Sequence, residues 1–283
     1  MTVGMESLGE IVAGELGRIS ARLEAKEGDY RDESGILICG ECGQPKEARI
    51  EFRGSVQTLP CMCRCAEEAW NRKEAEFKER QRKIRIEQLR VNGIQDEHLQ
   101  SCRFENAEDS IYVRKCKQFV EHWDEIRKEN TGLLLSGPVG TGKTFCAACI
   151  ANELIDHGVP VLMTSFPSVL GSRYVLNDII REANSFDLII VDDLGTERDT
   201  DYAAEVVYQF VDARYRSGKP MIVTTNLAPK DLRTQPDVKY RRIYDRVLEM
   251  CVPMVFNGDN RRTAKQKEKA GILREIINGE EQS

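Results

Sequence analysis

The feature that most constrains this chain is the octapeptide GPVGTGKT at residues 137–144, between the apolar run 133–135 and a helix-like segment at 145–150. Glycines let the backbone curl so that its N–H groups and a helix N-terminus face phosphates, while Lys143 neutralises them and Thr144 binds Mg²⁺. A glycine-rich turn beside a surface lysine is the alternative, but the strand-before, helix-after context favours a phosphate-binding loop. The predicted nucleotide-binding residues are Gly137, Pro138, Val139, Gly140, Thr141, Gly142, Lys143, Thr144 and Phe145.

A second signal lies 49 residues after Lys143, where the apolar run 186–191 ends in Asp192 and Asp193. The run is too short for an isolated helix and is typical of a buried parallel strand. Such a strand delivers both carboxylates to the sheet edge at which the phosphate loop begins. We expect Asp192 to hold Mg²⁺ and Asp193 to polarise the attacking water.

A third element is the β-rich run 219–225, which ends at Asn226. In a parallel sheet its polar end falls beside the two aspartates. An amide there can donate to a phosphate oxygen and accept from the attacking water, so Asn226 suits a γ-phosphate sensor. The alternative is that Asn226 merely caps the helix predicted at 227–233.

Together, GPVGTGKT, LIIVDDLGTE, VDARY and PMIVTTNL resemble the DnaC/DnaI/IstB branch of AAA+ ATPases. The resemblance covers residues 100–262 and includes similar phrases at 102–106 and 241–249. It implies an α/β fold, a P-loop AAA+ parallel five-stranded sheet sandwiched by helices, and hydrolysis of ATP with Mg²⁺. Strands are expected near residues 131–136, 159–164, 187–192, 220–225 and 252–256.

The same resemblance implies arginines that act on the γ-phosphate. An arginine supplied by a neighbouring subunit makes hydrolysis conditional on assembly. Arg246 is the first candidate for this finger, with Arg242 and Arg214 as rivals, and Arg262 is the candidate for a contact within the same subunit. The alternative for each is a solvated helix charge.

One position departs from many AAA+ enzymes, which place Glu where this chain has Asp193. The aspartate is shorter by one methylene, about 1.5 Å of reach. Because Asp-Asp is familiar in the loader-like branch, we expect an ATPase that turns over slowly and is stimulated by DNA or assembly, as suits a switch.

The N-terminal third carries five cysteines in two clusters separated by eighteen residues, Cys39 and Cys42, then Cys61, Cys63 and Cys65. A Cys-x-x-Cys-Gly knuckle lets two thiolates reach one tetrahedral ion, and the second cluster supplies two more ligands. The sequence predicts a structural zinc site that uses four of the five, with Cys63 and either neighbour favoured. A disulfide or unrelated buried thiols are the alternatives.

Composition excludes some classes of protein. At 283 residues with 41% hydrophobic and 31% charged residues, the chain suits two soluble domains, and no run approaches the roughly 20 apolar residues of a membrane span. No secretory leader is recognisable, so we expect a reducing cytoplasm. The net charge is −6, so nucleic-acid binding requires a local patch. The other five cysteines are expected to be core residues: Cys102, Cys116, Cys146, Cys149 and Cys251.

The organisation expected along the chain is a series of five segments. They are an N-terminal helical segment (1–35), a zinc-binding module (36–66), a charged connector helix (67–99), the ATPase domain (100–262) and a charged tail (263–283). The N-terminal segment could dock a partner or fold back on the module. The connector has a single apolar seam at seven-residue spacing, which is narrower than a true coiled coil and suits a connector or a partner-facing helix.

Single-stranded DNA is expected to contact the segment 165–174, where the family builds such a site. Phe166, Arg173 and Tyr174 could stack bases and pair phosphates, although Phe166 could instead pack on the sheet. The resemblance implies an ATP-dependent loader that grips a hexameric replicative DNA helicase through its N-terminal domain and self-associates, as a hexamer or a spiral on the helicase, through the ATPase domain. The alternatives are an IstB-like transposition helper and a nucleotide-gated adaptor or inhibitor of the helicase.

Overall fold

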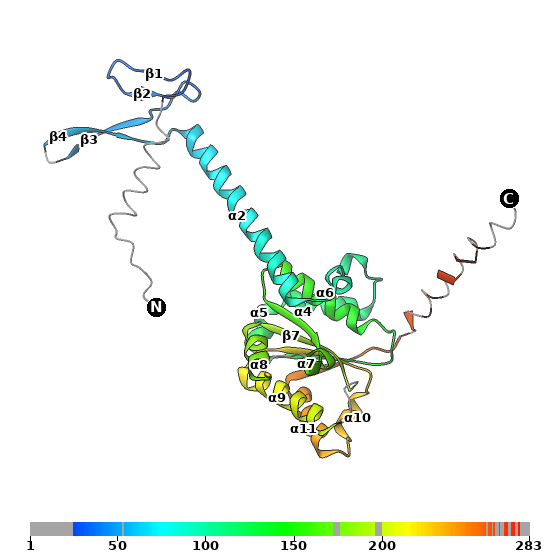
Figure 1. Ribbon diagram of the computed structural model, residues 1–283. Coiled ribbons are helices and arrows are strands. Elements are labelled where there is room, and N and C mark those ends of the chain that lie inside the picture. Colours follow the sequence, from blue (N-terminus) through cyan, green and yellow to red (C-terminus); the bar gives the residue numbers. More distant parts are fainter. Residues whose placement is uncertain are drawn as a thin grey trace. The chain divides into compact units, whose positions relative to one another are not determined.

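The computed structural model describes residues 25–258 except 53, 172–175 and 196–199, and beyond them residues 260, 261, 263, 266, 269, 270, 273, 274 and 277 (Figure 1). The chain forms two compact units, the first ending at Gln81 and the second beginning at Arg82. Within the described residues, no helix has the length and apolarity needed to cross a membrane.

The first unit contains two small antiparallel sheets, β1 with β2 and β3 with β4. Its elements are β1 (Tyr30–Arg31), β2 (Leu37–Ile38), β3 (Glu47–Phe52), β4 (Ser55–Pro60) and the first part of α2 (Arg64–Gly93). In the described part of this unit, the buried apolar side chains are Leu37, Ile38, Cys39 and Cys63. So small a core indicates that something besides apolar burial holds this unit together.

The expected N-terminal helix falls on residues 1–24, which lie outside the described residues. The strand pair β1–β2 spans the boundary expected at residue 35. The charged helix runs from Arg64 to Gly93, so it begins before the connector expected at 67–99 and ends before residue 99, and a separate short helix follows at Glu97–Gln100. Its apolar seam is exposed at Trp70, Phe77, Ile84 and Val91.

The second unit is built on a five-stranded parallel sheet in the order β6-β7-β8-β5-β9. Its strands are β5 (Gly132–Ser136), β6 (Val161–Ser165), β7 (Leu188–Leu194), β8 (Met221–Thr225) and β9 (Cys251–Val255). The expected number, type and order along the chain of these strands are confirmed, with bounds that agree to within two residues. Strand β5 lies between β8 and β9 and leads into the glycine-rich loop, so the loop emerges from an interior strand of the sheet.

Helices cover both faces of this sheet (Figure 1). They are α3 (Glu97–Gln100), the 3-10 turn η1 (Phe104–Asn106), α4 (Ile111–Glu121), α5 (Trp123–Lys128), α6 (Lys143–Asp156), α7 (Phe166–Gly171), α8 (Leu176–Ser185), α9 (Asp201–Ser217), α10 (Pro229–Arg233) and α11 (Val238–Met250). Alternating strand residues serve the two faces: in β7, Leu188 and Ile190 join the core under α4 and α6, whereas Ile189 and Val191 join the core under α9 and α11. This alternation is the period of two that a strand buried on both faces imposes.

Polar side chains fix where several helices begin. Ser110 Oγ accepts a hydrogen bond from the N–H of Val113 at the start of α4, and Thr200 Oγ1 accepts one from Ala203 at the start of α9. Asp237 caps α11 in the same way. Such caps satisfy donors that the first helical turn leaves without partners.

The end of α2 is fixed to the phosphate-loop helix within the second unit. Arg90 is buried and pairs with Asp156 near the end of α6, while its Nε approaches Asn152 Oδ1 at 3.5 Å. Gly93 lies so near β6 that a Cβ there would stand 2.0 Å from the carbonyl oxygen of Val161. The chain therefore leaves α2 already packed against the sheet.

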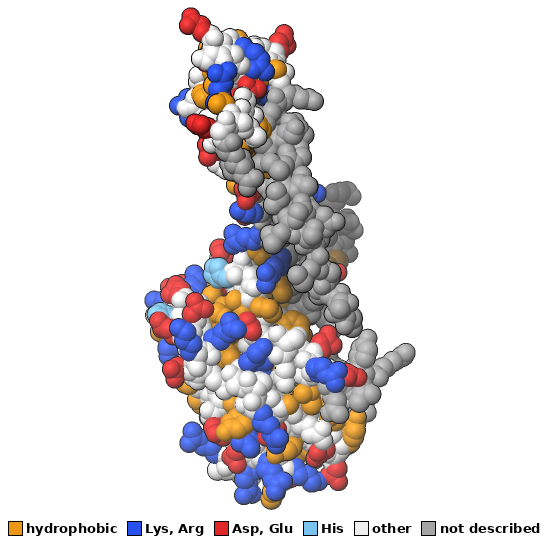
Figure 2. Space-filling model, turned by 90° about the vertical axis from the view of Figure 1, so that its left-hand side faces the viewer, with side chains coloured by type: hydrophobic (Ala, Val, Ile, Leu, Met, Phe, Trp, Pro, Cys, Tyr) orange, Lys and Arg blue, Asp and Glu red, His pale blue; other side chains and the backbone are white. Residues whose placement is uncertain are grey.

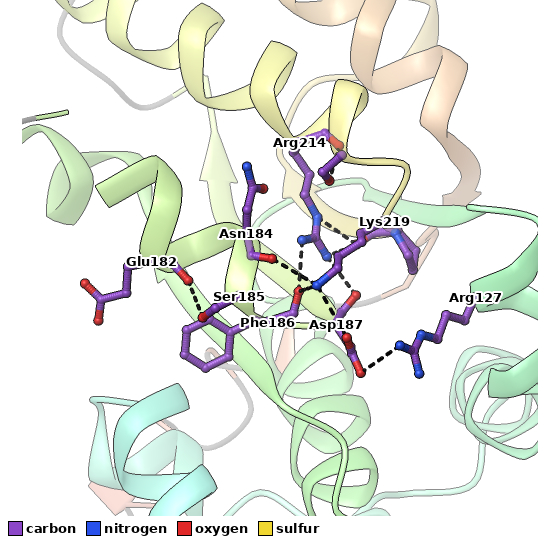
Figure 3. Close-up of polar contacts among 10 residues, drawn as sticks. Arg127, Glu182, Asn184, Ser185, Phe186, Asp187, Arg214 and Lys219 are labelled. Carbon is purple, nitrogen blue, oxygen red and sulfur yellow. Dashed lines mark hydrogen bonds and ion pairs between the residues drawn. The ribbon is translucent and has the colours of Figure 1, made fainter. Parts of the chain in front are cut away.

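A buried arginine organises the start of two strands (Figure 3). Arg214, in α9, is fully buried and donates hydrogen bonds to the carbonyl oxygens of Pro220, Phe186 and Asp187. Burial lowers its pKa to about 10. Lys219 adds bonds from its Nζ to the carbonyls of Asn184 and Phe186. These contacts tie the end of α8 and the entries to β7 and β8 together.

Candidate nucleotide site and candidate metal centre

The glycine-rich loop follows β5 and leads into α6, as the sequence predicts. Gly137 has φ 142°, and a Cβ there would stand 2.3 Å from the carbonyl oxygen of Phe256, so both the backbone conformation and the space require glycine. Gly142, at φ 96°, precedes the first residue of α6. The loop therefore ends at a helix N-terminus, where backbone N–H groups and the helix dipole favour an anion.

Lys143 lies in the middle of the site with its side chain buried. Its Nζ donates to the carbonyl oxygens of Gly137 and Pro138, at 2.7 and 2.9 Å, and to Asn226 Oδ1 at 2.9 Å. An ammonium group has three donors, and all three meet neutral acceptors here. A phosphate oxygen that replaced any of them would gain a charge-assisted bond.

Asp192 stands at the end of β7 and joins the loop helix to β8. Its Oδ1 accepts hydrogen bonds from Thr144 Oγ1 at 2.8 Å and from Thr224 Oγ1 at 2.7 Å. Burial raises the pKa of Asp192, against the lowering effect of these two hydroxyls. The Thr144 hydroxyl and the Asp192 carboxylate are hard oxygen donors of the kind that suits Mg²⁺. This donor pair fits the expected magnesium ion.

Asp193 adopts a backbone conformation that is uncommon for a residue with a side chain, at φ 59°. The register between β7 and β8 shifts at this point, because Val191 pairs with Val223 but Leu194 pairs with Thr225. The Asp193 N–H donates to Thr224 Oγ1 at 2.9 Å. β7 therefore has one extra residue here, a β-bulge. The bulge changes the direction of the Asp193 side chain from the one that regular strand alternation would give, as bulges beside functional sites do.

Asn226 follows β8 directly, and its Oδ1 accepts from Lys143 Nζ. The structure thus brings the phosphate loop, the end of β7 and the end of β8 to one place, as a parallel sheet requires. The cap for the helix at 229–233 is instead Ala228, which makes no side-chain bond. The capping alternative for Asn226 is not what the structure shows.

The segment after β9 returns to the loop. Phe256 packs against Gly137 and its ring stacks on Tyr112 with centroids 4.3 Å apart. The N–H of Arg261 donates to the carbonyl oxygen of Gly140 at 3.0 Å. Arg262 lies outside the described residues, so its role within the same subunit stays a prediction.

The three candidates for a finger arginine lie in very different surroundings. Arg214 is buried with its guanidinium bound to carbonyls, which leaves it no surface toward a neighbouring subunit. Arg242 and Arg246 both line a hollow on α11 and α9, together with Tyr208, Asp245 and Glu249. Lys and Arg side chains gather at the end of this unit where Figure 1 places α10 and α11 (Figure 2). The geometry therefore removes Arg214 and keeps Arg246 and Arg242.

The expected DNA-contact segment requires one correction. Phe166 is fully buried at the start of α7 and meets Phe210 edge-on, with ring centroids 6.1 Å apart. A side chain held in the core cannot stack a base, so Phe166 is a packing residue. Arg173 and Tyr174 lie outside the described residues.

Four cysteines gather in the first unit, Cys39, Cys42, Cys63 and Cys65, and their sulfurs all lie within 4.8 Å of one another. Cys65 Sγ is 3.4 Å from Cys39 Sγ and 3.3 Å from Cys63 Sγ. Zn–S bonds of about 2.3 Å in a tetrahedron would place sulfurs about 3.8 Å apart. The cluster therefore fits zinc, and Cys65 is the partner of Cys63 that the sequence left undecided.

The fifth cysteine of the module, Cys61, stands apart. Its Sγ donates to the carbonyl oxygen of Pro45 at 3.4 Å, and burial raises its pKa. In contrast, N–H groups of Cys65 and Gln44 lower the pKa of Cys42 to about 6. Hydrogen bonds from backbone N–H groups stabilise a thiolate, the form that binds metal. The module thus prepares thiolates at the knuckle and leaves Cys61 outside it.

A buried ion pair holds the knuckle in place. The Asp29 carboxylate pairs with Lys46 and accepts the N–H of Gly40 at 3.1 Å. Its pKa falls to about 2, chiefly because of the bond from Lys46. Gly40 must be small, since a Cβ there would stand 1.9 Å from the carbonyl oxygen of Gly28.

Sequence reasoning missed two residues, one beside Asp192 in the candidate nucleotide site and one beside the candidate finger arginine. Thr224 bonds Asp192 and the backbone of Asp193, and its only signal was its place two residues before Asn226. Asp212, in α9, forms an ion pair with Arg246, for which the sequence offers no signal because the two lie on different helices.

Comparison with known proteins agrees with this geometry. The sequence matches the family described as IstB-like ATP-binding proteins over residues 66–270. The replicative helicase loader DnaC of Escherichia coli (strain K12) is 28% identical over 190 residues, which cover 61% of this chain and 73% of that protein. The replicative helicase loader DnaI of Bacillus subtilis (strain 168) is 26% identical over 160 residues, 51% of each chain. The resemblance expected from the motifs is thereby confirmed.

Among solved structures, the crystal structure of DnaI matches with a TM-score of 0.51 and 24% identity, covering 59% of this chain and 93% of that chain. At this identity the match supports the fold alone. It agrees with the five-stranded parallel sheet and flanking helices of the second unit.

Proposed function

Because the chain belongs to the family of IstB-like ATP-binding proteins, we propose that it is an ATP-dependent loader that places a hexameric replicative DNA helicase on single-stranded DNA. The observation that carries this proposal is that helicase loaders from two organisms match 61% and 51% of this chain. The residues of the candidate nucleotide site converge within the range 66–270 that the family matches. The N-terminal cysteine module is a further domain for gripping the helicase.

The residues around the loop divide the work of phosphoryl transfer. Lys143 would bind β- and γ-phosphate oxygens, and Thr144 and Asp192 would hold Mg²⁺, which when bound would neutralise charge on the phosphates. Asp193, turned out of the strand by the bulge, orients the attacking water. Asn226, bonded to Lys143 in this structure, senses the γ-phosphate. The loop of residues 137–145 surrounds the triphosphate.

Hydrolysis depends on assembly through an arginine from the next subunit. Arg246 is our candidate because its side chain is 34% exposed on α11, whereas that of Arg214 is buried. A guanidinium directed at the γ-phosphate of a neighbour stabilises the charge of the transition state. Self-association through the ATPase unit, as a hexamer or a spiral on the helicase, would then act as the switch.

Zinc would be held by Cys39, Cys42, Cys63 and Cys65, and would act structurally because four protein ligands leave no open coordination position. The exposed apolar side chains of the adjoining hairpin, Ile50, Val56 and Leu59, are suited to contact with a protein partner. The metal would thus stabilise the module, and the hairpin would contact the partner.

A transposition helper of the IstB type is the second candidate, and the description of the matching family favours it. The cysteine module favours the loader, since transposition helpers typically lack it. A nucleotide-gated adaptor that binds the helicase without loading it is the third candidate.

Gel filtration with a hexameric replicative helicase separates these functions. We expect the wild-type chain to co-elute with the helicase in ATP and Mg²⁺. The elution of Lys143→Ala with the helicase should be the same with and without ATP. Lys128→Ala, which changes an exposed lysine of α5, should behave as wild type. Absence of a complex in every nucleotide state would overturn the loader and leave the transposition helper. A complex without DNA-stimulated ATP turnover would favour the adaptor.

A further inference from the structure

Arg246 is contacted by three groups, of which Asp212 and Tyr215 lie on α9 and Glu249 lies on its own helix, α11. Its Nε stands 3.5 Å from Asp212 Oδ1, its Nη1 stands 3.7 Å from Glu249 Oε2, and its guanidinium carbon lies 4.2 Å from the centre of the Tyr215 ring. Tyr215 is itself fixed, because its hydroxyl donates to Glu249 Oε1 at 2.6 Å. A long side chain that would otherwise sample many rotamers is thereby restrained on several sides.

Asp212 is the least accessible member of this group. The Asp212 residue is 7% exposed, and its Oδ2 meets Arg216 Nε at 2.8 Å. Its Oδ1 is buried and accepts no hydrogen bond from any residue that the structure describes. Buried carboxylate oxygens ordinarily have a polar partner, and the cation that pairs with this oxygen is the Arg246 guanidinium, at 3.5 Å.

We propose that Asp212 is a positioning residue for Arg246, holding the guanidinium on α9 in the orientation in which it meets the nucleotide of a neighbouring subunit. This inference rests on the proposed function, in which Arg246 is the finger. Asp212 touches no nucleotide itself. It acts because a partly buried carboxylate beside the Nε edge restrains the plane of the guanidinium while the side chain keeps an exposed face.

The placement of Asp212 separates this role from general stabilisation. Arg216, its second partner, is 76% exposed and lies four residues further along α9, so this pair does not join α9 to another helix. Arg246 is the less exposed partner, and it comes from α11, a different helix. Loss of the Asp212 charge should therefore release Arg246 while α9 and α11 stay packed through the buried residues Val207, Val211 and Val247.

Mixing of two inactive full-length variants tests this inference. Asp193→Asn subunits keep Arg246 but do not hydrolyse ATP, and Arg246→Ala subunits keep the nucleotide site but lack the finger. We expect their mixture, with ATP, Mg²⁺ and single-stranded DNA, to recover turnover that neither variant shows alone. Adding Asp212→Asn to the Asp193→Asn subunit should lower that recovery about tenfold, through kcat and with KM for ATP unchanged.

The matched control adds Arg216→Ala to the Asp193→Asn subunit, and it should recover turnover as fully as Asp193→Asn alone. Thermal unfolding of each donor subunit shows that it is folded. Full recovery with the Asp212→Asn donor would overturn the role of Asp212 and leave the finger intact. An equal loss with Arg216→Ala would assign the effect to the α9 surface as a whole and overturn the inference. No recovery in the first mixture would overturn the finger itself.

Discussion

The two candidate sites of this chain are held together in opposite ways. The nucleotide site rests on a sheet whose two faces are buried by helices, and its polar residues already bond one another, as Lys143 does with Asn226. The cysteine site rests on four buried apolar side chains in the described part of its unit. Its four sulfurs lie within 4.8 Å of one another.

This contrast indicates in which unit the fold depends on a bound ligand. In the nucleotide site, the buried faces of the sheet hold the unit together, so we expect its fold not to depend on a bound nucleotide. In the cysteine site, backbone N–H groups lower the pKa of Cys42, while contact with Cys63 raises the pKa of Cys65. Four sulfurs at metal-ligand spacing, in a unit whose described part has a small core, favour folding that is coupled to metal.

Removal of metal should have the largest effect. Structural zinc contributes about 10 kcal/mol or more to folding of small domains, so chelation or Cys42→Ser should unfold the first unit and leave the thermal transition of the second in place. Cys61→Ser is the matched control, since Cys61 lies outside the cluster, and it should keep metal and fold. Metal analysis, with about one ion per chain expected, and limited proteolysis measure this. Full metal retention by Cys42→Ser would contradict the ligand set.

Arg214→Ala should produce the next largest effect, this time in the second unit. Loss of the buried guanidinium leaves the carbonyls of Phe186, Asp187 and Pro220 without these donors, which should lower the free energy of unfolding by about 4 kcal/mol. Urea unfolding measures it. Arg216→Ala, in the same helix but exposed, should cost less than about 1 kcal/mol. Equal losses of unfolding free energy in the two variants would show that the contacts of Arg214 with the carbonyls do not stabilise the unit.

Lys143→Ala should change function and not fold. We expect ATP turnover to fall at least about 100-fold, equivalent to about 2.7 kcal/mol of transition-state stabilisation. The thermal midpoint should stay close to that of the wild type, because the lysine bonds only loop carbonyls and Asn226. Steady-state hydrolysis with Mg²⁺ measures the effect. Turnover that survives the substitution would place hydrolysis elsewhere.

Arg90→Ala should have the smallest effect and should locate the boundary between the two units. Arg90 pairs with Asp156, whose side chain is 41% exposed, so the expected loss is about 1 kcal/mol. The loss should appear in the unfolding of the second unit and not of the first. Arg85→Ala, exposed on the same helix, is the control. A change confined to the first unit would contradict the assignment of this part of α2.

The motifs predicted most of the candidate nucleotide site because its residues lie near the carboxyl ends of strands or in the loop and helix that follow β5. Once the strands are parallel, Lys143, Asp192 and Asn226 must meet at one edge of the sheet, so sequence order alone determines the site. The bulge that turns Asp193 was not predictable, because it depends on the pairing of β7 with Thr224 on β8. The burial of Phe166 depends in the same way on Phe210 in α9.

The cysteine site was predictable in its ligand types but not in its full ligand set. Spacing could not choose between Cys61 and Cys65, because each is separated from Cys63 by a single residue. The choice follows from the end of β4, which leaves Cys61 beside Pro45, and from the start of α2, which brings Cys65 to the knuckle. The Asp29–Lys46 pair that supports the knuckle joins residues seventeen apart, and no sequence pattern predicts this pairing.

Loading of a hexameric replicative helicase onto a closed circle of single-stranded DNA tests the central claim most directly, because a closed ring cannot thread onto a circle without help. With ATP and Mg²⁺, the wild-type chain should produce helicase bound to the circle. Both Lys143→Ala and Cys42→Ser should fail, the first because of its candidate nucleotide site and the second because of the unit that we propose to bind the helicase. Loading that is unchanged by Lys143→Ala, or absent with the wild-type chain, would contradict the account.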